Sequence, residues 1–120
     1  MTTYNDDNIF AKILEGKNPC NKIYEDKGVL CFQDINPDSK IHVLIIPKSK
    51  YVSFHDFVSK ANEETITSFF NSIKIIVEKL DLVNSGYRLI TNHGMNANQE
   101  VPHFHFHLLA GENLGGIKSK

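Results

Sequence analysis

The sequence has only two cysteines, Cys20 and Cys31, and their separation matches none of the spacings that metal-binding cysteines use. Disulfides persist in oxidising compartments, whereas cytosolic proteins keep their thiols reduced. We therefore expect a cytoplasmic protein in which both thiols are reduced.

The sequence also lacks an excess of charge of one sign, because its formal net charge at pH 7 is −1. Nucleic-acid-binding domains carry clustered basic residues, and anionic membrane surfaces attract polybasic segments. No apolar run approaches the roughly 18 residues of a membrane span. The first seven residues have neither the basic nor the apolar region of a signal peptide. We expect no nucleic-acid partner and no membrane partner.

No low-complexity segment, repeat or compositional break divides the chain. Its 120 residues, of which 41% are hydrophobic, suffice for one domain with a single core. We expect a mobile tail over residues 1–7 and one domain over residues 8–120.

Hydrophobic periodicity predicts an α+β fold. Apolar residues recur at helical spacing after Asn8 and again from about Asn62 to Leu82, which predicts one short N-terminal helix and one long helix. Short apolar runs bounded by turn residues predict five strands, at residues 22–25, 29–33, 41–46, 86–92 and 103–109. This order predicts a mostly antiparallel sheet. The long helix carries no histidine, so we expect it to cover one sheet face and the chemistry to occupy the other.

Three of the six histidines lie within five residues, where His103, His105 and His107 alternate with Phe104 and Phe106. Because side chains alternate across a strand, this spacing predicts three imidazoles on one face and an apolar wall on the other. Neighbouring histidines would be about 6.5–7 Å apart at strand rise.

A metal site is one interpretation of this pattern, since catalytic zinc can bind three histidines and keep one open position. Three consecutive outward positions of a strand nevertheless span about 13 Å, which is too far for all three imidazoles to reach one ion. Two of them could chelate together. We expect no metal at this site.

A nucleophilic histidine is the second interpretation. An imidazole with a pKa of about 6.5 is largely neutral at pH 7, so one nitrogen of His105 can attack while the other donates a hydrogen bond. A phosphorus centre is a suitable target, and His103 and His107 could order it or relay a proton. Uncharged donors in the preceding loop, Asn92, Asn98 and Gln99, suit phosphate, and His42 is the next candidate to face the triad.

The histidine run resembles the His-φ-His-φ-His-φ-φ signature, φ being apolar, of the histidine-triad (HIT) nucleotide-binding family. The resemblance extends from about residue 8 to 116 in the order that the family shows, through residues 9–14, 23–26, 32–37, 42–48, 86–88, 92–94 and 99–103. The segment 108–116 looks like that of the Hint branch, the purine nucleoside phosphoramidase type. The resemblance implies a HIT-like fold, no cofactor and a homodimer.

The resemblance also implies catalytic roles. His105 would attack the α-phosphorus of an adenylated substrate, and water would then release AMP from the nucleotidyl-histidine. His107 would contact phosphate oxygens, His103 would support the nucleophilic ring, and His42 would complete the cluster.

The same resemblance implies a binding pocket for a purine nucleotide, which could be AMP, GMP or a conjugate. Asp34 would hold the ribose hydroxyls. The phosphate and leaving-group side would be formed by Asn92, Gln99, Glu100 and Val101. The purine would lie between apolar walls contributed by Ile9, Phe10, Ile13, Phe32 and Ile35.

Five positions depart from the family pattern. Asn8 and Ala11 flank the first block where some relatives carry a zinc-binding cysteine pair, so we expect no structural zinc. Lys50 stands where many relatives have histidine. Glu100 replaces a serine that helps to protonate the leaving group in some members, and Ala110 replaces a glycine.

The sequence therefore predicts a hydrolase that cleaves adenosine or other purine 5′-phosphoramidates, or other AMP conjugates. Hydrolysis of dinucleoside polyphosphates, the chemistry of the Fhit branch, is one alternative. A nucleotide-binding interaction module with incidental turnover is another.

Overall fold

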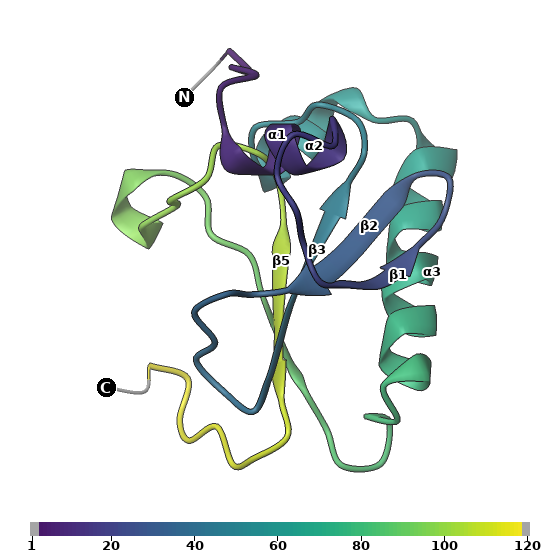
Figure 1. Ribbon diagram of the computed structural model, residues 1–120, viewed down its shortest axis with the longest axis vertical. Helices are drawn as coiled ribbons and strands as arrows, with labels where there is room; N and C mark the ends of the chain where they lie inside the picture. Colours follow the sequence, from purple (N-terminus) through teal and green to yellow (C-terminus); the bar gives the residue numbers. More distant parts are fainter. Residues whose placement is uncertain (1–2, 119–120) are drawn as a thin grey trace.

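The computed structural model describes residues 3–118, which form a five-stranded antiparallel sheet with helices on both faces (Figure 1). The strand order is β1-β2-β3-β5-β4. The elements in chain order are α1 (Ile9–Leu14), β1 (Lys22–Glu25), β2 (Val29–Gln33), β3 (Ile41–Pro47), α2 (Phe54–Lys60), α3 (Glu63–Lys79), β4 (Arg88–Ile90), the 3₁₀ turn η1 (Met95–Ala97) and β5 (Phe106–Ala110). The predicted α+β class, with its antiparallel five-stranded sheet, is confirmed.

The alternation of side chains along the central strands separates two apolar layers. On β2 and β3, Cys31 and Ile45 are fully buried toward α3, whereas Leu30 and Ile46 face the opposite side and pack with Phe10 of α1. One sheet face is therefore covered by the long helix, as the sequence predicts, and the other by α1.

The long helix begins where its cap predicts. The side chain of Asn62 accepts a hydrogen bond from the Thr65 amide, and Glu63 and Glu64 lie in the positively polarised first turn. Phe69 and Ile73 are among its buried residues, and they pack on the sheet. Figure 1 shows the helix along one side of the sheet, at a distance from α1.

The short helix α1 also has the predicted cap. Asn8 Oδ1 accepts from the Ala11 amide at 2.9 Å, and the helix ends before Gly16, whose positive φ of 78° favours glycine. The cap fixes the first turn of α1 and hence the position of Phe10 over the sheet.

Helix α2 is an addition to the two predicted helices. Its seven residues are too few for a clear apolar period, but its ends are specified locally. Ser53 accepts from the Asp56 amide, and the Asp56 carboxylate accepts from the Val52 amide at 2.8 Å. Phe57 then stacks on Phe104 with ring centroids 4.7 Å apart.

The strand that should carry the histidine triad is shorter than predicted. β5 begins at Phe106, so the prediction of a strand from residue 103 is wrong. The preceding backbone bonds elsewhere: the Phe104 amide donates to the Tyr51 carbonyl at 2.7 Å, and the His105 carbonyl accepts from Thr91 Oγ1 at 2.8 Å. The alternation persists nevertheless, since Phe104 and Phe106 both enter the core beneath α3.

The chain ends bear on two of the predicted boundaries. Residues 1–2 of the predicted tail and residues 119–120 of the predicted domain lie outside the described residues. Within the described tail, Tyr4 contacts His103 and Asp6 pairs with Lys50. Mobility of the tail remains a prediction. In residues 3–118, no helix combines the length and the apolarity needed to cross a membrane.

The burial of Phe57 predicts a large loss of stability on truncation. Phe57→Ala should lower the free energy of unfolding by about 3–5 kcal/mol, because it leaves a cavity between α2, α3 and Phe104. Val58→Ala is the matched control: Val58 is the next residue of the same helix and is 45% exposed. It should cost less than about 1 kcal/mol. Urea unfolding measures both, and equal losses would contradict this packing.

Candidate active site

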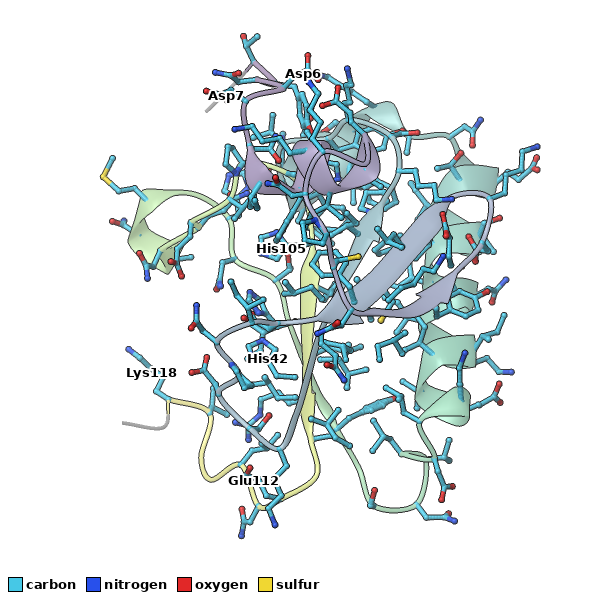
Figure 2. All side chains as sticks on the ribbon, in the orientation of Figure 1. Asp6, Asp7, His42, His105, Glu112 and Lys118 are labelled. Carbon is cyan, nitrogen blue, oxygen red and sulfur yellow. The ribbon has the colours of Figure 1, made fainter. Side chains whose placement is uncertain are left out.

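A cavity of about 430 Å³ opens on the sheet face that carries α1. It brings together most of the residues that the sequence predicts for the site. These are Ile9, Phe10, Ile13, Phe32, Asp34, Ile35, His42, Asn92, Glu100, Val101, His105 and His107. Figure 2 shows the labelled His105 and His42 over the central strands, with His105 nearer α1.

His105 makes one short contact that determines which of its nitrogens is reactive. Its Nδ1 lies 2.7 Å from the carbonyl oxygen of His103. A carbonyl can only accept, so Nδ1 carries the hydrogen and Nε2 of the neutral ring keeps its lone pair. The ring of Phe10 lies edge-on to that of His105, with centroids 5.0 Å apart. The ring of His105 therefore donates through Nδ1 and keeps an unshared lone pair on Nε2.

His103 is fully buried and does not line the cavity. Its Nε2 donates to the Pro47 carbonyl at 2.9 Å, which leaves Nδ1 as an acceptor, 2.6 Å from the Tyr4 hydroxyl. The structure thus makes His103 a support for His105, through its own carbonyl, and keeps its ring away from any ligand in the cavity.

His107 and His42 form a second chain of contacts. The Asp38 amide donates to His42 Nδ1 at 3.0 Å, so Nε2 carries the hydrogen in the neutral ring. His42 Nε2 lies 2.9 Å from His107 Nδ1 and 3.3 Å from Asp34 Oδ2. His107 Nδ1 then acts as acceptor, which leaves Nε2–H of His107 as a donor.

Burial is the main electrostatic influence on the triad. Desolvation lowers the pKa of His103 and of His105 to about 4, outweighing their hydrogen bonds to carbonyl oxygens, which raise it. Desolvation also lowers the pKa of His107, and the neighbouring His42 lowers it further. His105 is therefore neutral at pH 7, as a nucleophile must be.

The loop before the triad divides into cavity-facing and structural residues. Asn92 and Glu100 line the cavity, together with Asn98. Gln99, predicted to contact substrate, does not line it, because its side chain closes the loop. Its Nε2 donates to the Val52 carbonyl at 2.7 Å, and its Oε1 accepts from the Gly94 amide at 3.0 Å.

A HIT domain model matches residues 15–114. The chain belongs to the HIT domain family. A HIT-like protein of Rickettsia prowazekii is 45% identical over 114 residues, which cover 95% of each chain. The purine nucleoside phosphoramidase of Escherichia coli strain K12 is 36% identical over 110 residues, 92% of each chain. A solved histidine triad protein from Clostridium difficile has 36% identity and a TM-score of 0.85, covering 95% of this chain and 98% of that one.

A HIT family hydrolase from Clostridium thermocellum gives a further structural match. It has a TM-score of 0.80 and 36% identity, and the alignment covers 93% of this chain and 96% of that one. The family resemblance that the histidine pattern predicts is thus confirmed.

Two contributions to the site of this HIT protein were missed by sequence reasoning. Tyr4 was assigned to a tail, and no local pattern indicates that its hydroxyl reaches a residue 99 positions away. Asp38, which is not among the predicted site residues, holds His42 through its backbone amide. Of the two residues, only Asp38 could have been found from the sequence. A turn four residues before a histidine at a strand start places the backbone amides of the turn near the histidine side chain.

Among the described residues, one trio could hold a cation. Ligand atoms of Asp34, His42 and His107 lie within 4.8 Å of one another. The set draws on only one member of the triad, because His103 and His105 turn nitrogens to backbone carbonyls. His42 Nε2 already contacts both His107 and Asp34. These hydrogen bonds in the wall of the cavity also account for the close spacing of the three side chains.

The lowered pKa values predict that stability falls in acid. The unfolded chain binds protons near pH 6.5, whereas the folded His103 and His105 bind them only near pH 4. Stability is therefore complete above pH 6.5 and is lost as the pH falls toward 4. Each of the two histidines should lower the free energy of unfolding by about 2 kcal/mol between pH 7 and pH 5.

Urea unfolding at several pH values measures this loss. His105→Gln should remove the contribution of one histidine and make the pH dependence shallower, whereas His55→Gln, at an exposed position on α2, should leave it unchanged. An identical pH dependence in wild type and His105→Gln would contradict the burial argument.

Proposed function

We propose that the protein is a nucleotide-binding hydrolase that cleaves purine nucleoside 5′-phosphoramidates or other AMP conjugates through a nucleotidyl-histidine intermediate. One observation carries the proposal: the His103 carbonyl holds the hydrogen of His105 on Nδ1, so the lone pair on Nε2 is free for attack. A neutral imidazole in this arrangement needs no separate base to activate it.

The proposed reaction has two steps. The Nε2 lone pair of His105 attacks the α-phosphorus, the phosphorus–nitrogen bond of the substrate breaks, and the departing amine takes a proton from solvent. Water then attacks the phosphorus and gives up a proton to solvent, the bond between phosphorus and His105 Nε2 breaks with its electron pair returning to Nε2, and AMP leaves. His107, with its hydrogen on Nε2, is suited to donate to a phosphate oxygen as charge develops there.

The rest of the cavity suits a nucleoside. Phe10 and Phe32 pack edge-on with centroids 5.6 Å apart, and they form an apolar wall for a purine ring. Asp34 accepts from the Asn36 amide at 2.8 Å through Oδ1, and its remaining lone pairs can accept from two ribose hydroxyls. Both features support a nucleotide in preference to a small phosphoramidate without a base.

Similarity to a purine nucleoside phosphoramidase supports the choice of bond. Two alternatives from the sequence remain to be separated by experiment: hydrolysis of dinucleoside polyphosphates, and nucleotide binding without physiological turnover. Cleavage of an adenosine phosphoramidate should exceed that of a diadenosine polyphosphate. The reverse order would favour the polyphosphate activity, and AMP binding without turnover of either compound would favour the binding module.

We also propose a homodimer. β4 is an edge strand in the order of the sheet, and it pairs only with β5 among the described residues. Tyr87 and Leu89 in and beside it are 44% and 37% exposed. An exposed strand edge with apolar side chains can pair with a second copy of itself.

Replacement of the nucleophile should abolish turnover. His105→Ala should reduce kcat for adenosine phosphoramidate by on the order of 10⁴-fold, because no other side chain among residues 3–118 presents the same free nitrogen to the cavity. Circular dichroism and urea unfolding would verify that the variant folds. Activity within a few-fold of wild type in a folded His105→Ala would contradict the mechanism.

Removal of metal ions should leave turnover unchanged. The proposed nucleophile is an imidazole nitrogen, so the reaction needs no metal-activated water. Prolonged treatment with a chelator, followed by assay in metal-free buffer, tests this. Loss of activity that returns when zinc is added would instead assign a catalytic ion, for which Asp34, His42 and His107 are the available ligands.

A further inference from the structure

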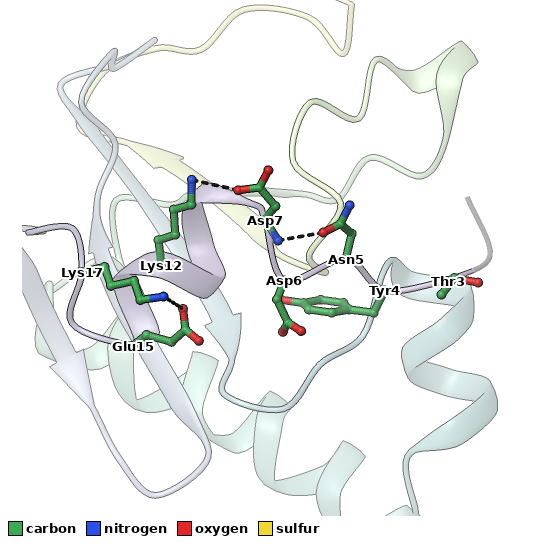
Figure 3. A pocket seen from close by; sticks show the side chains of 8 residues that line it. All are labelled: Thr3, Tyr4, Asn5, Asp6, Asp7, Lys12, Glu15 and Lys17. Atoms are coloured by element: carbon green, nitrogen blue, oxygen red, sulfur yellow. Dashed lines mark hydrogen bonds and ion pairs between the residues drawn. The ribbon is translucent and has the colours of Figure 1, made fainter.

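The first described residues of the chain lie beside the site and contact His103, the buried member of the triad. We call residues 3–8 the N-terminal strap. Figure 3 shows a cleft between the strap and α1, lined by charged side chains that pair with one another. Asp7 pairs with Lys12 at 3.0 Å, and Glu15 with Lys17 at 3.5 Å. Since its charges are paired, the cleft itself offers little to a ligand, and the contacts behind it are more informative.

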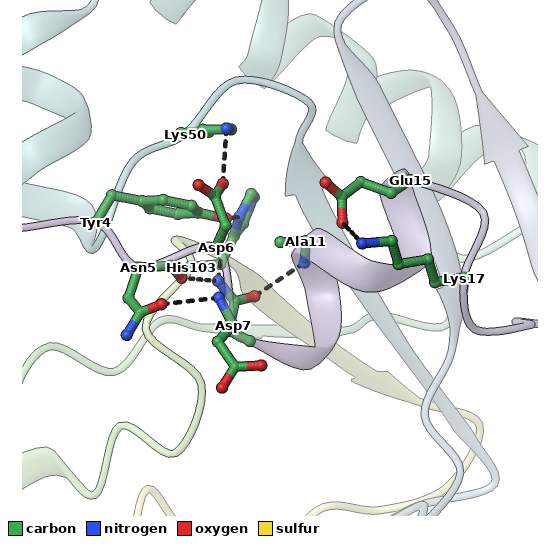
Figure 4. A network of polar contacts seen from close by, with 10 residues as sticks. Tyr4, Asn5, Asp6, Asp7, Ala11, Glu15, Lys17, Lys50 and His103 are labelled. Carbon is green, nitrogen blue, oxygen red and sulfur yellow. Dashed lines mark hydrogen bonds and ion pairs between the residues drawn. The ribbon is translucent and has the colours of Figure 1, made fainter.

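The main contact of the strap is a hydrogen bond from Tyr4 to His103 (Figure 4). The tyrosine oxygen lies 2.6 Å from His103 Nδ1. His103 Nε2 already donates to the Pro47 carbonyl, so Nδ1 can only accept and the tyrosine must donate. Burial raises the pKa of the Tyr4 hydroxyl, which keeps its hydrogen in place.

The tyrosine hydroxyl is held from its other side as well. Asn8 Nδ2 donates to it at 3.1 Å, while Asn8 Oδ1 accepts from the Ala11 amide as the cap of α1. One asparagine thus joins the first turn of α1 to the hydroxyl of Tyr4. Because α1 also carries Phe10, which packs against His105, the strap connects the apolar wall of the cavity with the support of its nucleophile.

Water cannot replace the tyrosine hydroxyl without a rearrangement, because His103 is fully buried. A buried acceptor that loses its partner keeps the full cost of its desolvation. The Tyr4 ring also packs edge-on against the His103 ring, with centroids 5.5 Å apart. A change of Tyr4 to phenylalanine would keep this ring packing and remove the hydrogen bond to His103, so the two contributions can be separated experimentally.

A second contact anchors the strap near the same residue. Asp6 pairs with Lys50 at 2.6 Å (Figure 4), and Lys50 lies three positions after Pro47, the acceptor of His103 Nε2. The pair is exposed on both sides, so its contribution to stability is small. Its effect is to hold the strap near the end of β3, where His103 contacts Pro47.

We propose that Tyr4 is a positioning residue for the nucleotidyl transfer, acting through His103. Its hydroxyl fixes the His103 ring between the strap and Pro47, and the carbonyl of that same residue fixes the hydrogen of His105 on Nδ1. Loss of the hydroxyl frees the ring, loosens the carbonyl, and lowers the fraction of His105 whose Nε2 is aimed into the cavity. This inference rests on the proposed function for its kinetic readout.

Tyr4→Phe is the direct test. It should lower kcat for adenosine phosphoramidate by about 5- to 50-fold, the range expected when a buried hydrogen-bonding group loses its partner. KM should stay within about 2-fold, because neither Tyr4 nor His103 lines the cavity proposed to hold the nucleotide. A kcat within 2-fold of wild type in Tyr4→Phe would overturn the proposal.

Tyr24→Phe is the matched control. Tyr24 donates its hydroxyl to Asp26 at 2.9 Å on the far hairpin, so the change removes a comparable hydrogen bond away from the site. It should leave kcat and KM at wild-type values. An equal loss of kcat in both variants would show a general effect of instability and would also overturn the proposal.

A double-mutant cycle with His103→Gln asks whether Tyr4 acts through His103. Tyr4→Phe should have no further effect on kcat in the His103→Gln background, because the group on which it acts is gone. An undiminished effect there would place the action of Tyr4 elsewhere and contradict the proposal.

Imidazole nitrogen NMR gives a readout that requires neither turnover nor the His103 variant. Wild type should show His105 as a single Nδ1–H tautomer, and Tyr4→Phe should shift both His103 nitrogens and mix the tautomers of His105. If wild type turns over no substrate but these changes occur, the proposed function fails and the positioning role stands. If His105 is unchanged in Tyr4→Phe, the positioning role fails whatever the activity.

Discussion

The hydrogen bond from His105 Nδ1 to the carbonyl of His103 is the interaction on which the rest of the site depends. The two residues are two positions apart in the sequence, and the bond is 2.7 Å long. It can form because the strand β5 begins only at Phe106, so the His103 carbonyl is not part of the hydrogen bonding between strands. A regular strand would direct that carbonyl toward a neighbouring strand. Because β5 starts late, the His103 carbonyl is available to accept from His105 Nδ1. This fixes the Nδ1–H tautomer of His105 and leaves the lone pair of Nε2 free.

Burial keeps the imidazole rings of His103 and His105 neutral, and it also requires hydrogen-bond partners for their buried nitrogens. Phe10 packs on the His105 ring, and desolvation lowers the pKa of His103 and His105 to about 4, so both rings are neutral across the physiological range. Neutral buried imidazoles need a partner for every nitrogen that faces the interior. Pro47 and Tyr4 supply these partners for His103, and no buried side-chain polar atom of the described residues lacks one. The same hydrogen bonds therefore stabilise the buried histidines and orient the His105 ring.

Features set by neighbouring residues were predictable from the sequence. The cap at Asn8, the first two strands and the inward course of Phe104 and Phe106 follow from periodicity and capping, which act within a few positions. The cavity residues required the family resemblance, because no local pattern places α1 over the triad. The structural use of Gln99 and the reach of Tyr4 to His103 were not predictable, since both depend on which loops the tertiary fold brings together.

Trapping the covalent intermediate would show directly whether His105 is the nucleophile. The protein would be mixed with a slowly hydrolysed AMP conjugate, quenched during turnover, digested, and analysed by tandem mass spectrometry. We expect an adenylyl group on His105 alone, formed and lost at rates that match turnover. Turnover without this adduct, or an adenylyl group on His103 or His107 in its place, would contradict it.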